Sequence, residues 1–319
     1  MDDLPLLSAT AIASLVPMRD AIDALWAAYR TRAASIDRLH VPLSDGDLLI
    51  MAATDETAAE TGSETGAAGV KIVLVSGTGR DRTGPAIQGV FVLFDTVRGA
   101  PIALLDGAAL TRLRTPAVSA IATDVLARHD VTTLGIFGAG PQASGHVEAM
   151  RLARPSLVEV LVASRSDSSA LLDALRATGI AARQASADEA AAADVVCTCT
   201  SSPLPVLASQ LVRPGAHINA VGSYRPDRRE IEGDLVRRSM VFVDDLLAAR
   251  SEAGDLVMAQ SEGGWSFEDV GGDLVSICRG EVARTGAQQV TLFKSVGLAR
   301  QDLVVAVVAA RRAGLFGAR

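Results

Sequence analysis

The sequence predicts an α/β protein in which a doubly wound, Rossmann-type parallel sheet is joined to a second, α+β domain. Candidate strands in the first third of the chain follow one another with few helices between them. From about residue 116, strands alternate with helices, which is typical of a parallel sheet. The length of 319 residues suits two domains, at roughly 100–200 residues each.

The first third is expected to fold as a separate α+β unit. Apolar residues at three- and four-residue spacing predict an amphipathic helix over residues 9–34. Two strands are expected in residues 37–53, around the turn composition of Ser44–Asp47. Further strands are expected over residues 69–75, 89–95 and 101–106. Polar, glycine-containing composition indicates loops at residues 54–68 and 76–85.

The remainder of the chain carries the alternating pattern. A helix is expected over residues 117–128 and another around residues 168–178. Short apolar runs predict strands over residues 133–137, 158–162, 193–198, 217–221 and 241–243. Residues 290–314 predict one long apolar helix that returns to the first unit.

Composition and charge exclude several classes of protein. The chain is 49% hydrophobic and 21% charged, which is a globular balance. A formal net charge of −7 argues against binding to nucleic acid. No run of 18 apolar residues and no basic leader are present, so neither a membrane span nor a signal peptide is expected. Three cysteines cannot all pair, so we expect reduced thiols and a cytoplasmic protein.

Lysine is scarce in this chain. Only Lys71 and Lys294 are lysine among the 30 basic residues. Lysine differs from arginine in that its pKa can shift into a catalytic range. The two positions therefore suggest a chemical role, although codon bias explains the same pattern.

A glycine-rich turn predicts a dinucleotide site. The six residues Gly138, Ala139, Gly140, Pro141, Gln142 and Ala143 fit the pattern G-x-G-x-x-A, after a predicted strand and at the start of a helix. Gly138 would make the tight turn, Gly140 would let the backbone approach a pyrophosphate, and Ala143 would permit close helix packing. A plain strand–helix turn is the alternative.

The end of the second strand favours NADP(H) over NAD(H). NAD-binding proteins place a carboxylate about 20 residues after the glycine turn, where it holds the ribose 2′-hydroxyl. Here that place holds Ser164, Arg165 and Ser166, and Asp167 comes two residues late. An arginine and hydroxyl groups suit a 2′-phosphate. An exposed arginine at a strand end is the alternative.

Five motifs in order give the chain a family resemblance. They are Lys71 shortly after a glycine, Thr111–Thr115, the Gly138–Ala143 turn, Val221–Pro226 with Glu230, and Phe293–Gly297 followed by Gln301 and Asp302. With these motifs the chain resembles the ornithine cyclodeaminase/μ-crystallin family from about residue 38 to 313. The resemblance implies a homodimer of two-domain chains. Residues 1–116 and 295–319 would form the substrate and dimerisation domain, and residues 117–294 the dinucleotide-binding domain.

The resemblance also implies the site residues. Arg38, Lys71 and Arg114 would bind the substrate's α-carboxylate, which needs fixed cationic donors when it leaves water. Catalytic roles are expected for Lys71, Arg114 and Glu252, and Tyr224 would line the substrate pocket. Besides the glycine turn and residues 164–166, the expected cofactor contacts are Thr115, Thr200, Ser202, Gly222 and Ser295. A surface ion pair for Arg114, a packing role for Tyr224 and a solvated helix end for Glu252 are the alternatives.

One departure from the family bears on the reaction. The cyclodeaminase carries an aspartate where this chain has Tyr224, and Asp227 lies three residues further on. The resemblance is therefore to the ketimine reductase side of the family. It implies an NADPH-dependent imine reductase acting on an α-imino acid such as Δ1-pyrroline- or Δ1-piperideine-2-carboxylate.

Other functions stay open at this point. They are an alanine-type amino-acid dehydrogenase that uses NAD, an ornithine cyclodeaminase, and a ligand-binding protein that holds NADPH without turnover. The expected partner is a small amino or imino acid, with no nucleic acid and no membrane. Cys197 and Cys199 suggest a metal pair, but the four histidines are scattered, so no metal is expected. The chain has no G-x-S-x-G motif, so a serine hydrolase of that type is not expected.

Overall fold

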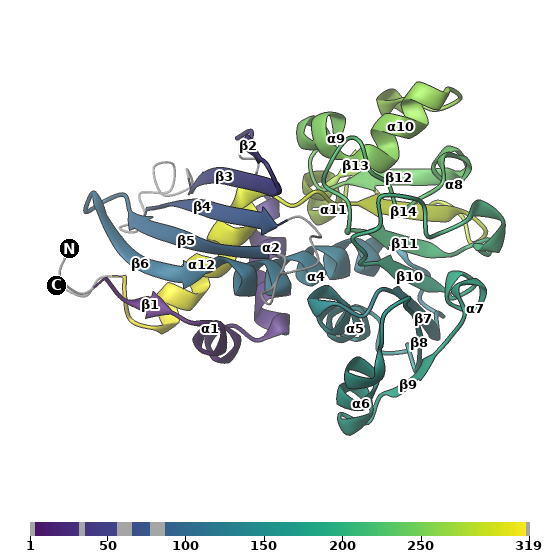
Figure 1. Ribbon diagram of the computed structural model, residues 1–319, viewed down its shortest axis with the longest axis horizontal. Helices are drawn as coiled ribbons and strands as arrows, with labels where there is room; N and C mark the ends of the chain where they lie inside the picture. Colours follow the sequence, from purple (N-terminus) through teal and green to yellow (C-terminus); the bar gives the residue numbers. More distant parts are fainter. Residues whose placement is uncertain (1–3, 32–35, 56–65, 77–86, 317–319) are drawn as a thin grey trace. The chain divides into compact units, whose positions relative to one another are not determined.

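The computed structural model of the chain divides into two compact units. Unit 1 comprises Met1–Arg114 with Leu298–Arg319, and unit 2 comprises Thr115–Gly297. The structure describes residues 4–31, 36–55, 66–76 and 87–316 (Figure 1). The division falls inside helix α4 (Gly107–Leu126). The observed architecture is the mixed α/β fold that the sequence predicts, with a parallel sheet in one unit and a separate sheet in the other.

Unit 1 contains a six-stranded sheet in the order β1-β6-β5-β4-β3-β2. Its strands are β1 (Leu6–Leu7), β2 (Leu39–Leu43), β3 (Gly46–Asp55), β4 (Ala67–Ser76), β5 (Ile87–Asp95) and β6 (Ala100–Asp106). Strands β2 to β6 are antiparallel, which confirms the predicted strand pairs, and the short β1 lies parallel to β6. Most of the two predicted loops, residues 56–65 and 77–86, lies outside the described residues.

Three helices accompany this sheet: α1 (Ala9–Leu15), α2 (Met18–Tyr29) and α12 (Ala299–Arg312). The single helix predicted over residues 9–34 is wrong because the chain is extended at Val16 and Pro17 and α2 begins after them. Helix α12 packs against β3, β4 and β5, and it crosses one face of the sheet in Figure 1.

The register separates the two faces of the sheet. Met51, Lys71, Phe91 and Leu105 are successive cross-strand partners, and Phe91 and Leu105 are fully buried. Their neighbours Ile50, Ile72 and Val90 form the next row of partners, whose side chains point to the opposite face because strand side chains alternate. The strand geometry therefore directs Lys71 toward the core of unit 1.

Unit 2 contains an eight-stranded sheet in the order β13-β12-β14-β11-β10-β7-β8-β9, and every pair in it is parallel. Its strands are β7 (Thr133–Phe137), β8 (Glu159–Ala163), β9 (Ala181–Gln184), β10 (Val195–Thr198), β11 (His217–Ala220), β12 (Ser239–Val243), β13 (Gly272–Asp273) and β14 (Val290–Lys294). The strand order reverses between β7 and β10, which is where doubly wound sheets bind dinucleotides.

The helices of unit 2 connect these strands. They are α5 (Pro141–Ala153), α6 (Ser169–Ala177), α7 (Ala187–Ala191), α8 (Gly233–Arg238), α9 (Leu246–Glu252), α10 (Gly254–Glu262) and α11 (Leu274–Arg279). Among the described helices, none is both long and apolar enough to cross a bilayer.

Two predicted helices need correction. Residues 290–294 form β14, a fully buried strand between β11 and β12, and only Ala299–Arg312 is helical. A short apolar run does not distinguish a buried strand from a helix segment by periodicity. Helix α4 begins at Gly107, ten residues before the predicted start at 117, because the helix continues through Pro116. Proline more often marks the beginning of a helix than its interior.

Candidate functional site

A buried cluster of charged side chains lies inside unit 1. The Nζ of Lys71, on β4, donates to Asp302 Oδ1 at 2.8 Å and to Thr111 Oγ1. Arg114 Nη1 donates to Gln301 Oε1 at 3.0 Å, and Arg114 Nε lies 3.6 Å from Asp302 Oδ1. Lys71 is 2% exposed, Arg114 6% and Asp302 0%. One carboxylate from α12 thus connects a strand lysine with a helix arginine.

Arg38 belongs to the same face of the sheet. It directly precedes Leu39, which pairs with Ile50, so alternation places Arg38 on the face that carries Met51 and Lys71. Arg38 is half-buried, and its charge lowers the pKa of Lys71. Unit 1 therefore brings together the three cations for which the family resemblance implies a role in binding a carboxylate.

Lys71 has an unusual protonation equilibrium. Its pKa is lowered from 10.5 to about 8: burial is the largest cause, Arg114 and Arg38 act in the same direction, and the adjacent Asp302 opposes them. Among the described residues, Asp302 and Thr111 take up two of its three N–H groups. An ammonium with this pKa can release a proton near neutral pH.

The prediction of site residues missed Asp302, Gln301 and Thr111. The dipeptide Gln301–Asp302 was one of the resemblance motifs, and a carboxylate in a predicted apolar helix was the available signal. Asp302 Oδ2 is buried and accepts no hydrogen bond from the described residues. Such an oxygen is costly unless a ligand or water donates to it.

In unit 2, the glycine turn lies between β7 and α5. Gly138 has a φ of +104°, and a Cβ there would lie 2.8 Å from the carbonyl oxygen of Cys199. Gly140 is the extended N-cap of α5, with Pro141 as the first helical residue and no side-chain cap. Among the described residues, a Cβ at Gly140 would meet no atom within 4 Å. The turn therefore leaves an open space at a helix N-terminus, which fits a pyrophosphate.

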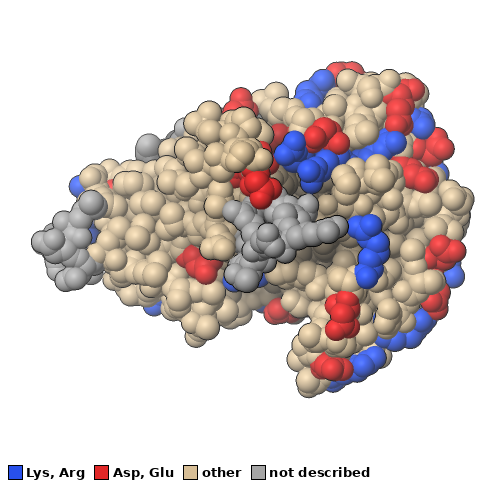
Figure 2. All heavy atoms as spheres, viewed as in Figure 1, with Lys and Arg blue, Asp and Glu red and all other residues tan. Residues whose placement is uncertain are grey.

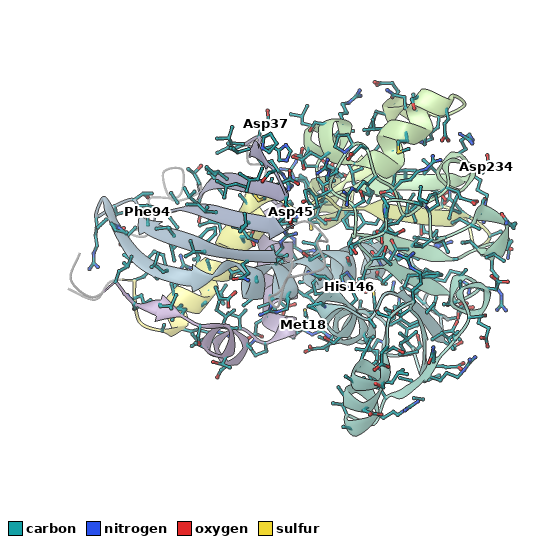
Figure 3. All side chains as sticks on the ribbon, viewed as in Figure 1. Met18, Asp37, Asp45, Phe94, His146 and Asp234 are labelled. Atoms are coloured by element: carbon teal, nitrogen blue, oxygen red, sulfur yellow. The ribbon has the colours of Figure 1, made fainter. Side chains whose placement is uncertain are left out.

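The last residue of this turn packs inward. Ala143 is fully buried, and the carbonyl of Gln142 accepts a hydrogen bond from Nδ1 of His146 at 2.8 Å. Nε2 of His146 lies 3.1 Å from Ser119 Oγ. Burial lowers the pKa of His146 to about 4, so this histidine (Figure 3) stays neutral and stabilises the start of α5.

The end of β8 carries the predicted 2′-phosphate contacts. Ser164 Oγ lies 3.0 Å from Ser166 Oγ, and Arg165 is exposed with no ion pair found among the described residues. The carboxylate of Asp167 accepts hydrogen bonds from the backbone N and the hydroxyl of Ser169, at 2.9 and 2.8 Å. These bonds lower the pKa of Asp167 and hold it at the start of α6.

Three further predicted cofactor residues lie after β10 and β11. Thr200 donates from its backbone N and its hydroxyl to Glu230 Oε1, at 2.8 and 2.7 Å. Gly222 N donates to Glu230 Oε2 at 2.7 Å, and a Cβ on Gly222 would overlap with Thr200 O. Ser202 Oγ donates to Leu204 O at 2.8 Å. Glu230, for which the sequence predicted no role, therefore connects Thr200 with Gly222.

Other predicted residues take different positions. The hydroxyl of Ser295 donates to Asp244 Oδ2 at 2.7 Å. Thr115 is a buried residue of α4, and its hydroxyl has no hydrogen-bond partner among the described residues. Tyr224 is half-buried and packs against the apolar core of unit 2. Glu252 is the half-buried last residue of α9.

Asp227 is paired with an arginine, and the two cysteines considered for a metal pair favour the protonated thiol. Asp227 accepts two hydrogen bonds from Arg225, at 3.0 and 3.1 Å, which lower its pKa. Burial raises the pKa of Cys197 to about 12 and raises that of Cys199 as well. Within the described ranges, no three His, Cys, Asp or Glu residues form a group that could hold a metal ion.

Comparison with known proteins gives consistent results. The model of the ornithine cyclodeaminase/mu-crystallin family matches residues 4–313. A Δ1-pyrroline-2-carboxylate reductase of Bacillus cereus (strain ATCC 10987 / NRS 248) is 35% identical over 315 residues, which is 94% of each chain.

Two solved structures are similar over nearly the whole chain. The Δ1-pyrroline-2-carboxylate reductase of Thermococcus litoralis, in complex with NADH and L-proline, has a TM-score of 0.91 at 29% identity and covers 98% of each chain. An archaeal alanine dehydrogenase dimer with bound NAD has a TM-score of 0.87 at 29% identity, over 97% of this chain and 96% of the other.

Proposed function

The chain belongs to the ornithine cyclodeaminase/mu-crystallin family, and we propose that it is an NADPH-dependent imine reductase. Its substrate is an α-imino acid such as Δ1-pyrroline-2-carboxylate or Δ1-piperideine-2-carboxylate. The observation that carries this proposal is the buried cluster of Lys71, Arg114 and Asp302 in unit 1. The reductase activity named for the Bacillus cereus relative supports the same reaction.

The charge of the cluster suits a carboxylate. Lys71 and Arg114 bring two cations to one buried carboxylate, Asp302, and Arg38 lies near enough to lower the pKa of Lys71. The surplus positive charge would be neutralised by the α-carboxylate of the substrate, and charge-assisted hydrogen bonds from a guanidinium fix its orientation. Substrate binding thus belongs to unit 1 in this proposal, and cofactor binding to unit 2.

Lys71 is the proposed proton donor. When bound, NADPH would supply a hydride for the imine carbon; the imine nitrogen must then take up one proton, so that C=N becomes CH–NH. Asp302 and Thr111 hold the ammonium of Lys71 by two N–H groups, which leaves the third N–H to face a substrate. A pKa of about 8 keeps Lys71 mostly protonated at pH 7 and lets it release the proton.

The residues of unit 2 fit the dinucleotide. The open space beside Gly140, at the uncapped N-terminus of α5, accommodates a pyrophosphate. Arg165, Ser164 and Ser166 are the donors proposed for the 2′-phosphate. The hydrogen bonds that Asp167 accepts from Ser169 support NADPH, because they hold this carboxylate at the helix start rather than on a ribose.

A homodimer is part of the proposal. On the sheet face opposite α12, the rows of Ile50, Ile72 and Val90 and of Leu48 and Leu74 are aliphatic, and Ile72 is 39% exposed. Figure 2 shows few charged side chains over this part of unit 1. A second copy of the chain is the proposed cover for this face, as exposed apolar patches of this kind mark interfaces. Light scattering of the purified protein tests whether it is a dimer. We also propose that the protein is located in the cytoplasm.

One assay series tests the function. Purified protein is given Δ1-pyrroline-2-carboxylate or Δ1-piperideine-2-carboxylate, and oxidation of NADPH and formation of the cyclic amino acid are followed. Parallel reactions contain L-alanine with NAD, and L-ornithine with NAD. We expect turnover of a cyclic imine and no proline from ornithine, because Tyr224 stands where the cyclodeaminase has its aspartate. Turnover of alanine alone would favour the dehydrogenase instead, and binding without turnover a ligand-binding protein.

A further inference from the structure

A buried network of charged side chains forms hydrogen bonds at the carboxyl ends of neighbouring strands in unit 2. The carboxylate of Glu230 accepts hydrogen bonds from Thr198 Oγ1 at 2.9 Å, from both N and Oγ1 of Thr200, and from Gly222 N. Thr198 is the last residue of β10, Thr200 lies two residues beyond it, and Gly222 follows β11. Glu230 is fully buried, so these four hydrogen bonds replace its hydration.

Asp255 and Lys294 extend the network. Asp255 accepts hydrogen bonds from the backbone N of Glu230 at 2.6 Å and of Ile231 at 2.9 Å, and it pairs with Lys294 Nζ at 2.7 Å. Lys294 is the last residue of β14, and its Nζ also donates to Ser223 O. All three charged side chains have 0% exposure. The backbone around Glu230 is therefore fixed from two sides.

A third carboxylate lies at the same edge of the sheet. Asp244 follows β12 and accepts hydrogen bonds from Ser295 Oγ and from the backbone N of Val296 and Gly297. Glu230, Asp244 and Asp255 thus place three buried carboxylates at this edge, and the ammonium of Lys294 pairs with Asp255. Burial raises the pKa of Glu230 above its ordinary value, although Lys294 and the hydrogen bonds from Thr200 act against this. Both oxygens of Glu230 accept hydrogen bonds, which favours the anion, and Glu230 and Asp255 together then exceed the charge of Lys294 by one negative charge.

The net charge lies on the side of the sheet that receives the nicotinamide half of a dinucleotide. The glycine turn follows β7 and the predicted 2′-phosphate contacts follow β8, so the adenosine half belongs to that side. The strand order reverses between β7 and β10, which leaves the carboxyl ends of β10, β11 and β14 for the other half.

We propose that Glu230 is a positioning residue for the nicotinamide, and that its buried charge favours the oxidised form of the cofactor. This inference rests on the proposed use of a pyridine nucleotide. Glu230 acts through Thr200 and Gly222, whose backbone it holds, and through its charge. The nicotinamide ring is neutral in NADPH and positive in NADP⁺, so a fixed negative charge stabilises the ring as the hydride leaves for the imine carbon.

The test measures affinity and needs no substrate. Dissociation constants of NADPH and NADP⁺ are determined by calorimetry for the wild type and for Glu230→Gln. The ratio Kd(NADP⁺)/Kd(NADPH) is expected to rise about tenfold in the variant, which corresponds to about 1.4 kcal/mol.

Two further variants separate charge from structure. Thr198→Val removes one hydrogen bond to Glu230 and keeps the charge, so its ratio is expected to stay within about twofold of the wild type. Asp244→Asn removes another carboxylate from the same edge and is expected to raise the ratio, which keeps the proposal testable if Glu230→Gln does not fold. Equal weakening of both nucleotides in Glu230→Gln, or an unchanged ratio in both charge variants, would overturn the proposal. Neither result depends on whether the protein reduces imines.

Discussion

Replacing Lys71 with arginine separates the two roles that this side chain can have. Arginine keeps a positive charge beside Asp302. If Lys71 only binds the carboxylate of the substrate, the Lys71→Arg variant should therefore retain much of the activity. A guanidinium does not release a proton at working pH, so a proton donor would be lost. The structure favours the second role, because the pKa of Lys71 is lowered to about 8 by burial and by the neighbouring arginines.

The expected loss follows from this geometry. With a pKa of about 8, roughly nine in ten Lys71 side chains carry the proton at pH 7, and the donor is both abundant and acidic enough to act. Proton transfer from a positioned group contributes about 10²–10⁴-fold to a rate. We therefore expect kcat of Lys71→Arg to fall by at least about 10²-fold on the best imine substrate.

The assay is steady-state oxidation of NADPH at saturating imine, with cofactor affinity measured separately. Arginine is larger than lysine, and overpacking a buried site costs about 1–3 kcal/mol. Lys294→Arg is the matched control for this effect on thermal stability, since Lys294 is the other lysine of the chain and is also fully buried beside a carboxylate. A kcat of Lys71→Arg within a few-fold of the wild type would refute proton transfer and leave Lys71 as a carboxylate-binding residue.

Three further predictions concern the two units. Reduction needs protonated Lys71, so the rate should fall as the pH rises through about 8. Asp302→Asn removes the group that raises the pKa of Lys71, so the pH profile of kcat should move to lower pH. Arg165→Asp should weaken NADPH by about 10- to 100-fold and NADH far less, because the 2′-phosphate loses a charge-assisted hydrogen bond; unchanged preference in binding assays would show that Arg165 is not the contact. Gly140→Ala should melt at the wild-type temperature, because its Cβ meets no described atom, and should lose nucleotide affinity, because that Cβ takes up the space proposed for the pyrophosphate. Gly138→Ala should lose about 1–3 kcal/mol of stability, because Gly138 has a φ of +104°. Equal melting temperatures of the two variants would contradict this account.

The sequence predicts the parts of the fold whose patterns are local. The β7–turn–α5 segment was predictable because a short apolar strand, two glycines and a helix start follow one another. The segment 290–294 was not, because an apolar run of this length suits a strand or a helix, and only its partners β11 and β12 decide. Likewise, the helix through Pro116 depends on packing that no local pattern records.

The candidate site shows the same division. Lys71 and Arg114 were found from their motifs, but Asp302, which connects them, comes from a helix 231 positions after Lys71. Glu230 was part of a motif, yet its function as the acceptor of four hydrogen bonds depends on three segments meeting at one edge of the sheet. Contacts of this kind are set by tertiary structure, so spacing along the chain does not reveal them.

The most direct test of the central claim is the reaction of the purified wild-type protein with Δ1-pyrroline-2-carboxylate and a reduced cofactor. NADPH and NADH are supplied in separate reactions, and proline is measured together with cofactor oxidation. The account predicts that proline forms in step with oxidation of the cofactor, and that kcat/KM is higher with NADPH than with NADH. No oxidation of either cofactor with a cyclic imine, in a preparation that binds NADPH, would contradict the assignment as an imine reductase.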